Sequence, residues 1–183
     1  MTISAEFFIS VDVETAGPNP ADYAMLSIGA CTLDDPPAKF YIELKPTFLN
    51  YKAEALEVSG LSMKALEVSG VPPKEGMKQF DRWIHQVTPK DKLPVFTAFN
   101  AAFDWMFVND YFHHYLGNNP FGHKALDIKA LYMGIRKTGW QDTSFHLVSH
   151  ALGINTSLTH HALEDAIQQA MLLKVLLKEL EGE

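Results

Sequence analysis

Phe7-Phe-Ile-Ser-Val-Asp-Val-Glu-Thr-Ala-Gly17 is the stretch of sequence that decides the fold. Its β-branched and aromatic residues predict a strand over 7–13, just before a loop rich in Gly and Pro. Residues two apart in a strand point to the same face, so Asp12 and Glu14 place two carboxylates on one side. Like charges this close raise each other's pKa unless a cation lies between them, and Mg²⁺ and Mn²⁺ prefer such oxygens. Taken alone, the pair is either a metal site or a solvated strand end.

The order of the predicted elements is typical of a single α/β domain over residues 1–183. Three strands follow one another through short connections, at 7–13, 25–33 and 39–44, which predicts an antiparallel meander. Further strands are predicted over 93–99 and 124–128. Helices are predicted over 51–68 in two pieces divided at Gly60, then over 77–87, 100–116, 128–137, 144–152 and 163–180. Together these elements predict a mixed sheet flanked by helices.

Composition limits the classes of function. The 183 residues are 47% hydrophobic and 20% charged, which is a globular balance rather than that of a disordered chain. Fifteen Lys and Arg against 22 Asp and Glu give a formal charge of −7, which argues against nucleic-acid binding through a broad basic surface. This charge does not exclude binding of a few nucleotides through metal ions. Four basic residues either guide a nucleic-acid backbone or form a solvated helix face: Lys124, Lys129, Arg136 and Lys137.

The single cysteine and the hydropathy pattern indicate where in the cell the protein is expected. Cys31 lies in an apolar run, so a buried, unreactive thiol in a reducing compartment is expected. No stretch approaches the ~18 apolar residues of a membrane span, and the first residues lack the basic region of a signal peptide. The expected location is the cytoplasm, with no membrane association.

A second constellation is Asn100-Ala-Ala-Phe-Asp104, at a predicted strand-to-helix junction. Asn100 is predicted to be the helix N-cap, which places Asp104 in the first turns. The positive end of a helix dipole favours a carboxylate or a phosphate there. Asp104 is therefore either part of a site or a first-turn Asp that stabilises its own helix.

A third constellation is His160-His-Ala-Leu-Glu-Asp165. Residues five apart on a helix do not share a face, given ~3.6 residues per turn. They converge if His160 lies in the loop before the helix and Asp165 in its first turns. A His beside carboxylates is a candidate general base, although the chain has eight histidines and a surface His is the simpler explanation.

Taken together and in this order, the three segments resemble the motifs of the DEDDh 3′–5′ exonucleases, a branch of the ribonuclease H-like fold. Asp12-Val-Glu-Thr-Ala-Gly17 is similar to D-x-E-T-T-G, Asn100 to Asp104 to H-N-x-x-F-D, and His160 to Asp165 to H-x-A-x-x-D. The resemblance runs over about 7–177. It departs at Ala16, in place of the second Thr, and at Phe99, in place of His; Phe99 either stacks on a base or belongs to the core. No Tyr occurs from Phe145 onward, which separates the chain from the DEDDy branch.

The resemblance implies a fold, a reaction and a set of roles. The fold would be a five-stranded sheet with three antiparallel strands and then two parallel ones. Two Mg²⁺ or Mn²⁺ ions would be held by four carboxylates, His160 would be the general base, and nucleoside 5′-monophosphates would leave the 3′ end. The implied metal ligands are Asp12, Glu14, Asp104 and Asp165, and the implied substrate-binding residues are Thr15, Gly17, Leu61, Asn100 and Phe103.

The implied partners are the 3′ ends of single-stranded DNA or RNA, or short oligonucleotides, with a homodimer or a polymerase partner as further expectations. The motifs do not choose between DNA and RNA. Three alternatives stay open: an inactive subunit that tethers a polymerase or nucleic acid, a phosphodiesterase of small oligonucleotides, and an endonuclease or transposase of the same broad fold. The intact acidic residues and His160 argue against the first, and the spacing of the first and third motifs against the last.

Overall fold

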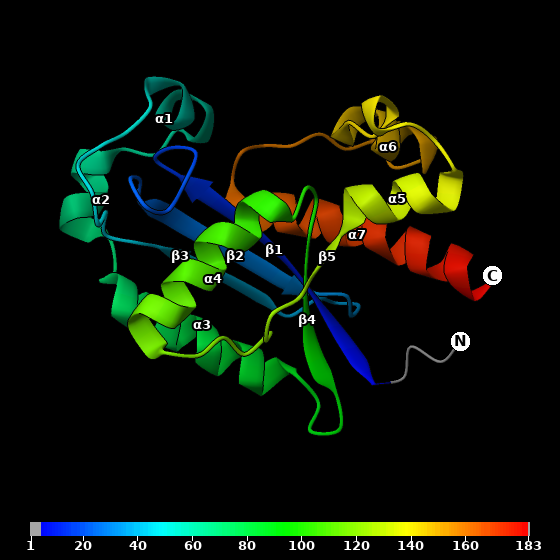
Figure 1. Ribbon diagram of the computed structural model, residues 1–183, viewed down its shortest axis with the longest axis horizontal. Helices are drawn as coiled ribbons and strands as arrows, with labels where there is room; N and C mark the ends of the chain where they lie inside the picture. Colours follow the sequence, from blue (N-terminus) through cyan, green and yellow to red (C-terminus); the bar gives the residue numbers. More distant parts are fainter. Residues whose placement is uncertain (1–4, 183) are drawn as a thin grey trace.

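The computed structural model describes residues 5–182, in which five strands form one mixed sheet in the order β3-β2-β1-β4-β5 (Figure 1). β1 and β2 are antiparallel, as are β2 and β3, whereas β4 and β5 run parallel to β1. This topology confirms the sheet that the resemblance implied. The strands are β1 (Glu6–Thr15), β2 (Met25–Thr32), β3 (Lys39–Glu43), β4 (Leu93–Ala98) and β5 (Ala125–Asp127).

The helices cover both faces of this sheet. α7 packs on β1 and β2 on one face, and α3 and α4 pack on the other (Figure 1). The core of the α3–α4 face contains Ile9 and Val11 of β1 with a cluster of phenylalanines, and a second core joins α5, α6 and α7. The helices are α1 (Ala53–Ser59), α2 (Met63–Ser69), α3 (Pro73–Val87), α4 (Ala102–Leu116), α5 (Ile128–Arg136), the 3₁₀ turn η1 (Trp140–Asp142), α6 (Phe145–Ala151) and α7 (Ala162–Glu181).

Two boundaries differ from the sequence prediction in ways that shape the site. β1 continues to Thr15 rather than ending at 13, so Asp12 and Glu14 both lie within the strand. Asn100 is not the N-cap of α4: it has a φ of 64°, and Ala101 occupies the cap position. The left-handed residue turns the chain sharply after β4, so α4 begins at Ala102, two residues later than predicted.

Close packing of α7 over the sheet depends on Gly29 of β2. A Cβ atom at this residue would lie 2.1 Å from the main-chain carbon of Ala162, so only glycine admits the first turn of α7. Gly29 pairs with Asp12 across the β1–β2 ladder. The start of α7 is therefore held directly above the neighbour of Asp12.

Two further expectations concern the interior and the membrane. Cys31 is fully buried, as predicted, and burial raises the pKa of its thiol to about 12, which makes it a poor nucleophile. Within residues 5–182, none of the helices combines the length and the apolar character needed to cross a bilayer.

Candidate active site

The site forms where β1 extends beyond β4. The parallel pairing of β1 with β4 ends at Ser10, so the following main-chain groups of β1 have no strand partner on that side. Asp104, in the first turn of α4, fills this gap: its Oδ1 accepts a hydrogen bond of 3.1 Å from the Val13 N–H. Asp104 is 4% exposed. A hydrogen bond from a main-chain N–H thus joins the segment Asn100–Asp104 to the segment Asp12–Gly17.

The third segment reaches the same place through the loop before α7. Asp165 accepts hydrogen bonds from the N–H groups of Thr159 at 2.7 Å and His160 at 2.9 Å, and from the Thr159 hydroxyl at 3.0 Å. These bonds hold His160 with a φ of 58°, a left-handed conformation rare for a residue with a side chain. His160 lies in the loop and Asp165 in the helix, the arrangement that lets them converge.

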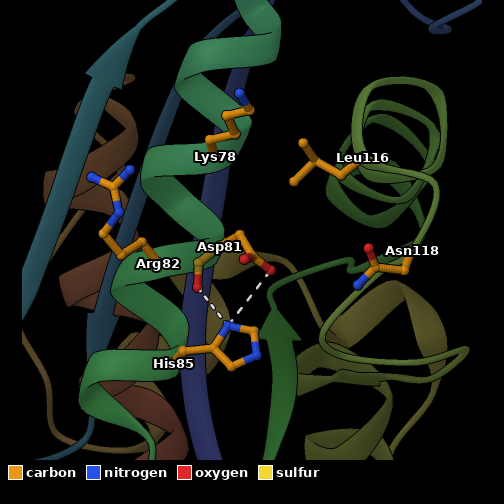
Figure 2. Close-up of a pocket in the computed structure, with 6 residues that line it drawn as sticks. All are labelled: Lys78, Asp81, Arg82, His85, Leu116 and Asn118. Carbon is orange, nitrogen blue, oxygen red and sulfur yellow. Dashed lines mark hydrogen bonds and ion pairs between the residues drawn. The ribbon is translucent and has the colours of Figure 1, made fainter.

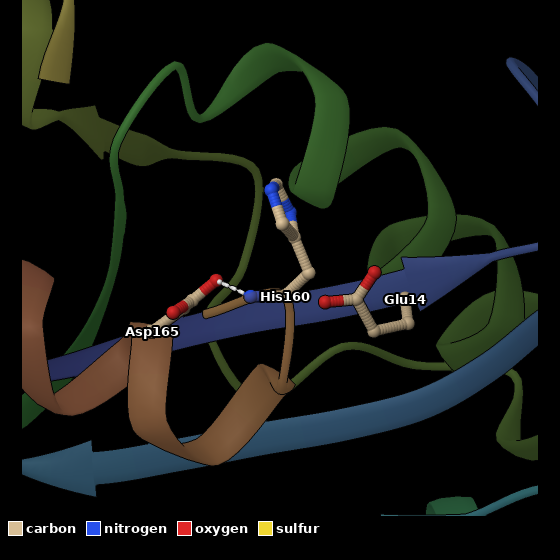
Figure 3. A group of neighbouring side chains, drawn as sticks. All are labelled: Glu14, His160 and Asp165. Atoms are coloured by element: carbon tan, nitrogen blue, oxygen red, sulfur yellow. Dashed lines mark hydrogen bonds between the residues drawn. The ribbon is translucent and has the colours of Figure 1, made fainter. Parts of the chain in front are cut away.

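Glu14, His160 and Asp165 come together in space (Figure 3). Each offers a ligand atom, and these atoms all lie within 4.8 Å of one another. The Asp165 carboxylate is buried, Glu14 is half-buried, and the His160 ring extends away from its loop into an exposed position. This group could hold a metal ion, with the imidazole of His160 accessible at its edge.

Asp12, Glu14 and Asp104 resist ionisation. Burial, then the charges of Asp104, Glu14 and Asp165, raise the pKa of Asp12 well above its usual value. Burial, followed by the charges of Asp165 and Asp104, raises the pKa of Glu14 to about 8. Burial also raises the pKa of Asp104 to about 7, against the hydrogen bond from Val13. Such crowding of acids favours a bound cation.

The donor set fits Mg²⁺ or Mn²⁺. Four carboxylates and one imidazole are hard or borderline ligands, and these ions prefer oxygen. Neither of the two ion pairs found within residues 5–182 involves these four carboxylates, so no side-chain cation occupies the place of a metal.

The predicted substrate-binding residues differ in burial and in what they contact. Thr15 and Gly17 are buried: the Thr15 hydroxyl donates to the Gly17 carbonyl at 2.9 Å, and a Cβ at Gly17 would strike the Tyr23 ring. Leu61 packs on the small cluster that contains Ala16, Phe103 is half-buried against Phe107, and Asn100 is exposed. Thr15 and Gly17 therefore shape the loop after β1 rather than present side chains.

Phe99 and the basic residues have other partners. The Phe99 ring packs edge-on against Phe145 at 5.1 Å, so it belongs to the core. Lys129 lies 4.1 Å above the ring of Trp140, and Arg136 pairs with Glu179. Lys124 and Lys137 are exposed.

A hollow between α3 and the end of α4 lies away from these groups (Figure 2). It is lined by Lys78, Asp81, Arg82 and His85 of α3 together with Leu116 and Asn118. The 15 residues of α4 extend about 22 Å, with Asp104 at one end and Leu116 at the other. This hollow is not part of the candidate active site.

Gln169 is the residue that sequence reasoning missed. Its side-chain Nε2 donates to Asp12 Oδ1 at 2.6 Å, and its Oε1 accepts from the Phe99 N–H at 2.8 Å. It lies one helical turn after Asp165 on the same face of α7. That spacing was the only signal in the sequence that could have found it.

The mixed sheet, with Glu14, Asp165 and His160 brought together at the end of β1, is the arrangement expected of a 3′–5′ exonuclease of the DEDDh type. A family model described as the Rv2179c-like 3′–5′ exoribonuclease domain matches residues 8–177, and the chain belongs to this family. The 3′–5′ DNA exonuclease Cap18 of Escherichia coli is 46% identical over 176 residues, which cover 96% of this chain and 94% of that protein.

Solved structures agree on the fold. The nuclease domain of 3′hExo, a DEDDh family member bound to rAMP, has a TM-score of 0.81 at 15% identity and covers 98% of this chain and 95% of that one. Escherichia coli Exonuclease I in complex with a dT13 oligonucleotide has a TM-score of 0.71 at 18% identity, covering 93% of this chain and 41% of that one.

Proposed function

We propose that the chain removes nucleotides from single-stranded 3′ ends with two divalent cations held by Asp12, Glu14, Asp104 and Asp165. The observation that carries the proposal is the convergence of Glu14, Asp165 and His160 within 4.8 Å, beside two further acids, Asp12 and Asp104, whose pKa values are raised above their usual range. When bound, Mg²⁺ or Mn²⁺ would supply Lewis acidity and neutralise charge on the scissile phosphate.

The chain's own residues perform the remaining steps. His160, exposed at the edge of the site, accepts a proton from the attacking water, whose oxygen bonds to the terminal phosphodiester phosphorus. The bond from phosphorus to the 3′-oxygen of the preceding nucleotide breaks, that oxygen takes up a proton, and the terminal nucleotide leaves as a 5′-monophosphate. The hydrogen bonds that the Thr159 and His160 N–H groups donate to Asp165 hold the loop that carries this imidazole. The loop after β1, shaped by Thr15 and Gly17, bounds the pocket for the last nucleotide, and Leu61, Asn100 and Phe103 contact it.

DNA is the substrate that we propose. The supporting observation is the relative 46% identical along nearly the whole chain, which is a DNA exonuclease. The description of the matching family favours RNA as the second candidate. Recognition of the ribose 2′-OH distinguishes the two polymers, so matched substrates decide between them.

The test is digestion of matched DNA and RNA single strands, labelled at the 3′ or the 5′ end, with Mg²⁺ and with Mn²⁺. Immediate release of the 3′ label as a mononucleotide, faster from DNA, supports the proposal. Cleavage of a closed circle would indicate an endonuclease, and turnover restricted to dinucleotides would indicate a small-oligonucleotide phosphodiesterase. No turnover with either metal would leave the tethering function.

Three further proposals concern organisation. We propose that residues 1–183 act as one exonuclease domain, since the first motif segment lies in the single five-stranded sheet and the helices that carry the other two pack on it. We propose a cytoplasmic location, supported by the single buried cysteine. A homodimer or a polymerase partner is proposed on the resemblance, and light scattering of the purified chain tests the first.

A further inference from the structure

Gln169 links β1 to the end of β4 through its side-chain amide. It belongs to α7 and is 2% exposed. Its Nε2 reaches Asp12 of β1 at 2.6 Å, and its Oε1 reaches the N–H of Phe99, just after β4, at 2.8 Å. Buried amides are costly unless both ends are satisfied, and here both ends are.

The orientation of this amide is fixed by its partners. The Phe99 N–H can only donate, so it must face the carbonyl oxygen of Gln169. The NH₂ group must then face Asp12, where it donates to Oδ1. Asp12 Oδ1 therefore has a fixed partner, and rotation of the carboxylate would break a short hydrogen bond.

We propose that Gln169 is a positioning residue of the cation site, which holds the Asp12 carboxylate in one orientation and ties it to the end of β4. The inference rests on the proposed function, because it requires Asp12 to be a cation ligand. Partners that orient metal ligands typically contribute about 10–100-fold to metal affinity or activity.

A neutral amide suits this position better than a charged group. Lys or Arg would place a positive charge where a divalent cation is required, and Glu would add a further negative charge beside Asp12. Gln169 also holds the main chain at Phe99, which is followed by Asn100 and the first turn of α4 with Asp104. One side chain thus links Asp12 by hydrogen bonds to the segment that leads into Asp104.

The experiment compares Gln169→Met with Gln168→Met. Met has a similar length and helix preference but cannot donate or accept these bonds. Gln168 is the preceding residue on α7, and among residues 5–182 its Oε1 finds no hydrogen-bond partner. We expect Gln169→Met to bind Mn²⁺ about 10–100-fold more weakly by calorimetry and to lose a similar factor in kcat, with KM for the oligonucleotide within about twofold. Gln168→Met should keep wild-type values for all three.

Circular dichroism establishes that each variant is folded. If Gln169→Met does not fold, Gln169→Glu replaces it, because Glu keeps the acceptor for the Phe99 N–H and removes the donor to Asp12; its kcat should fall about tenfold or more. A folded Gln169 variant with wild-type kcat would overturn the inference, as would Gln169→Met with wild-type Mn²⁺ affinity. A wild-type protein that neither binds Mn²⁺ nor shortens a 3′ end would instead refute the proposed function.

Discussion

Replacing Glu14 by glutamine should make the metal-free protein more stable at pH 8 while it removes activity. Burial and the charges of Asp165 and Asp104 raise the pKa of Glu14 from 4.5 to about 8. Between these values the folded protein keeps a proton on Glu14 that the unfolded chain has lost. The folded state then binds more protons, so the free energy of unfolding falls as the pH rises from about 4.5 to about 8. Gln has no charge to lose.

The size of this effect follows from the same values. A difference of one pH unit between folded and unfolded pKa corresponds to about 1.4 kcal/mol, which sets an upper limit of about 5 kcal/mol for Glu14. Glu14 is half-buried, and solvent screening reduces this to about 2 kcal/mol. In a chain of this length, 2 kcal/mol corresponds to a change of about 4–8 °C in Tm.

The assay is thermal unfolding of wild type and Glu14→Gln at pH 5 and pH 8, in EDTA and in Mg²⁺. In EDTA the two proteins should have similar Tm at pH 5, and Glu14→Gln should be higher by about 4–8 °C at pH 8. Mg²⁺ should raise the Tm of wild type more than that of the variant. A variant less stable than wild type at pH 8 in EDTA, or parallel pH profiles, would refute this reasoning.

Further perturbations test individual groups. Asp12→Ala should lower turnover about a thousandfold or more and weaken Mn²⁺ binding in calorimetry; activity above about a hundredth of wild type would contradict its assignment as a metal ligand. His160→Ala should lower kcat by about 10²–10⁴-fold with nearly unchanged Mn²⁺ affinity. His161→Ala removes a ring stacked on Tyr41 and should have a far smaller effect on kcat; the reverse ranking would show that the general base is misassigned. Gly29→Ala should destabilise by about 1–3 kcal/mol or more in urea unfolding, because its Cβ would meet the start of α7, whereas Gly134→Ala, with open space and a helical backbone, should stabilise by about 0.5–1 kcal/mol; equal midpoints would contradict the packing of α7 on the sheet.

The strands were predictable because β-branched residues and turn signals are local properties of the sequence, whereas their arrangement in the sheet was implied by the resemblance that the motif order carries. The position of His160 in the loop before α7 was also predictable, since two residues five apart converge only if one lies outside the helix. Asn100 was misassigned as a cap because its left-handed φ follows from the sharp turn after β4, which no local preference specifies. Gln169 was missed because its two partners are 157 and 70 residues away.

In the described part of the chain, the hydrogen bonds that orient the acidic residues all come from uncharged donors, and the absence of positive charge has a chemical consequence. Val13 donates a main-chain N–H to Asp104, Thr159 and His160 donate theirs to Asp165, and Gln169 donates its amide to Asp12. Each bond orients a carboxylate without neutralising it, whereas a salt bridge would cancel the charge. Along the described chain, 5–182, neither ion pair reaches these acids. Their repulsion is therefore left for a divalent cation to relieve. At a fixed high pH, binding of the cation should therefore raise the free energy of unfolding.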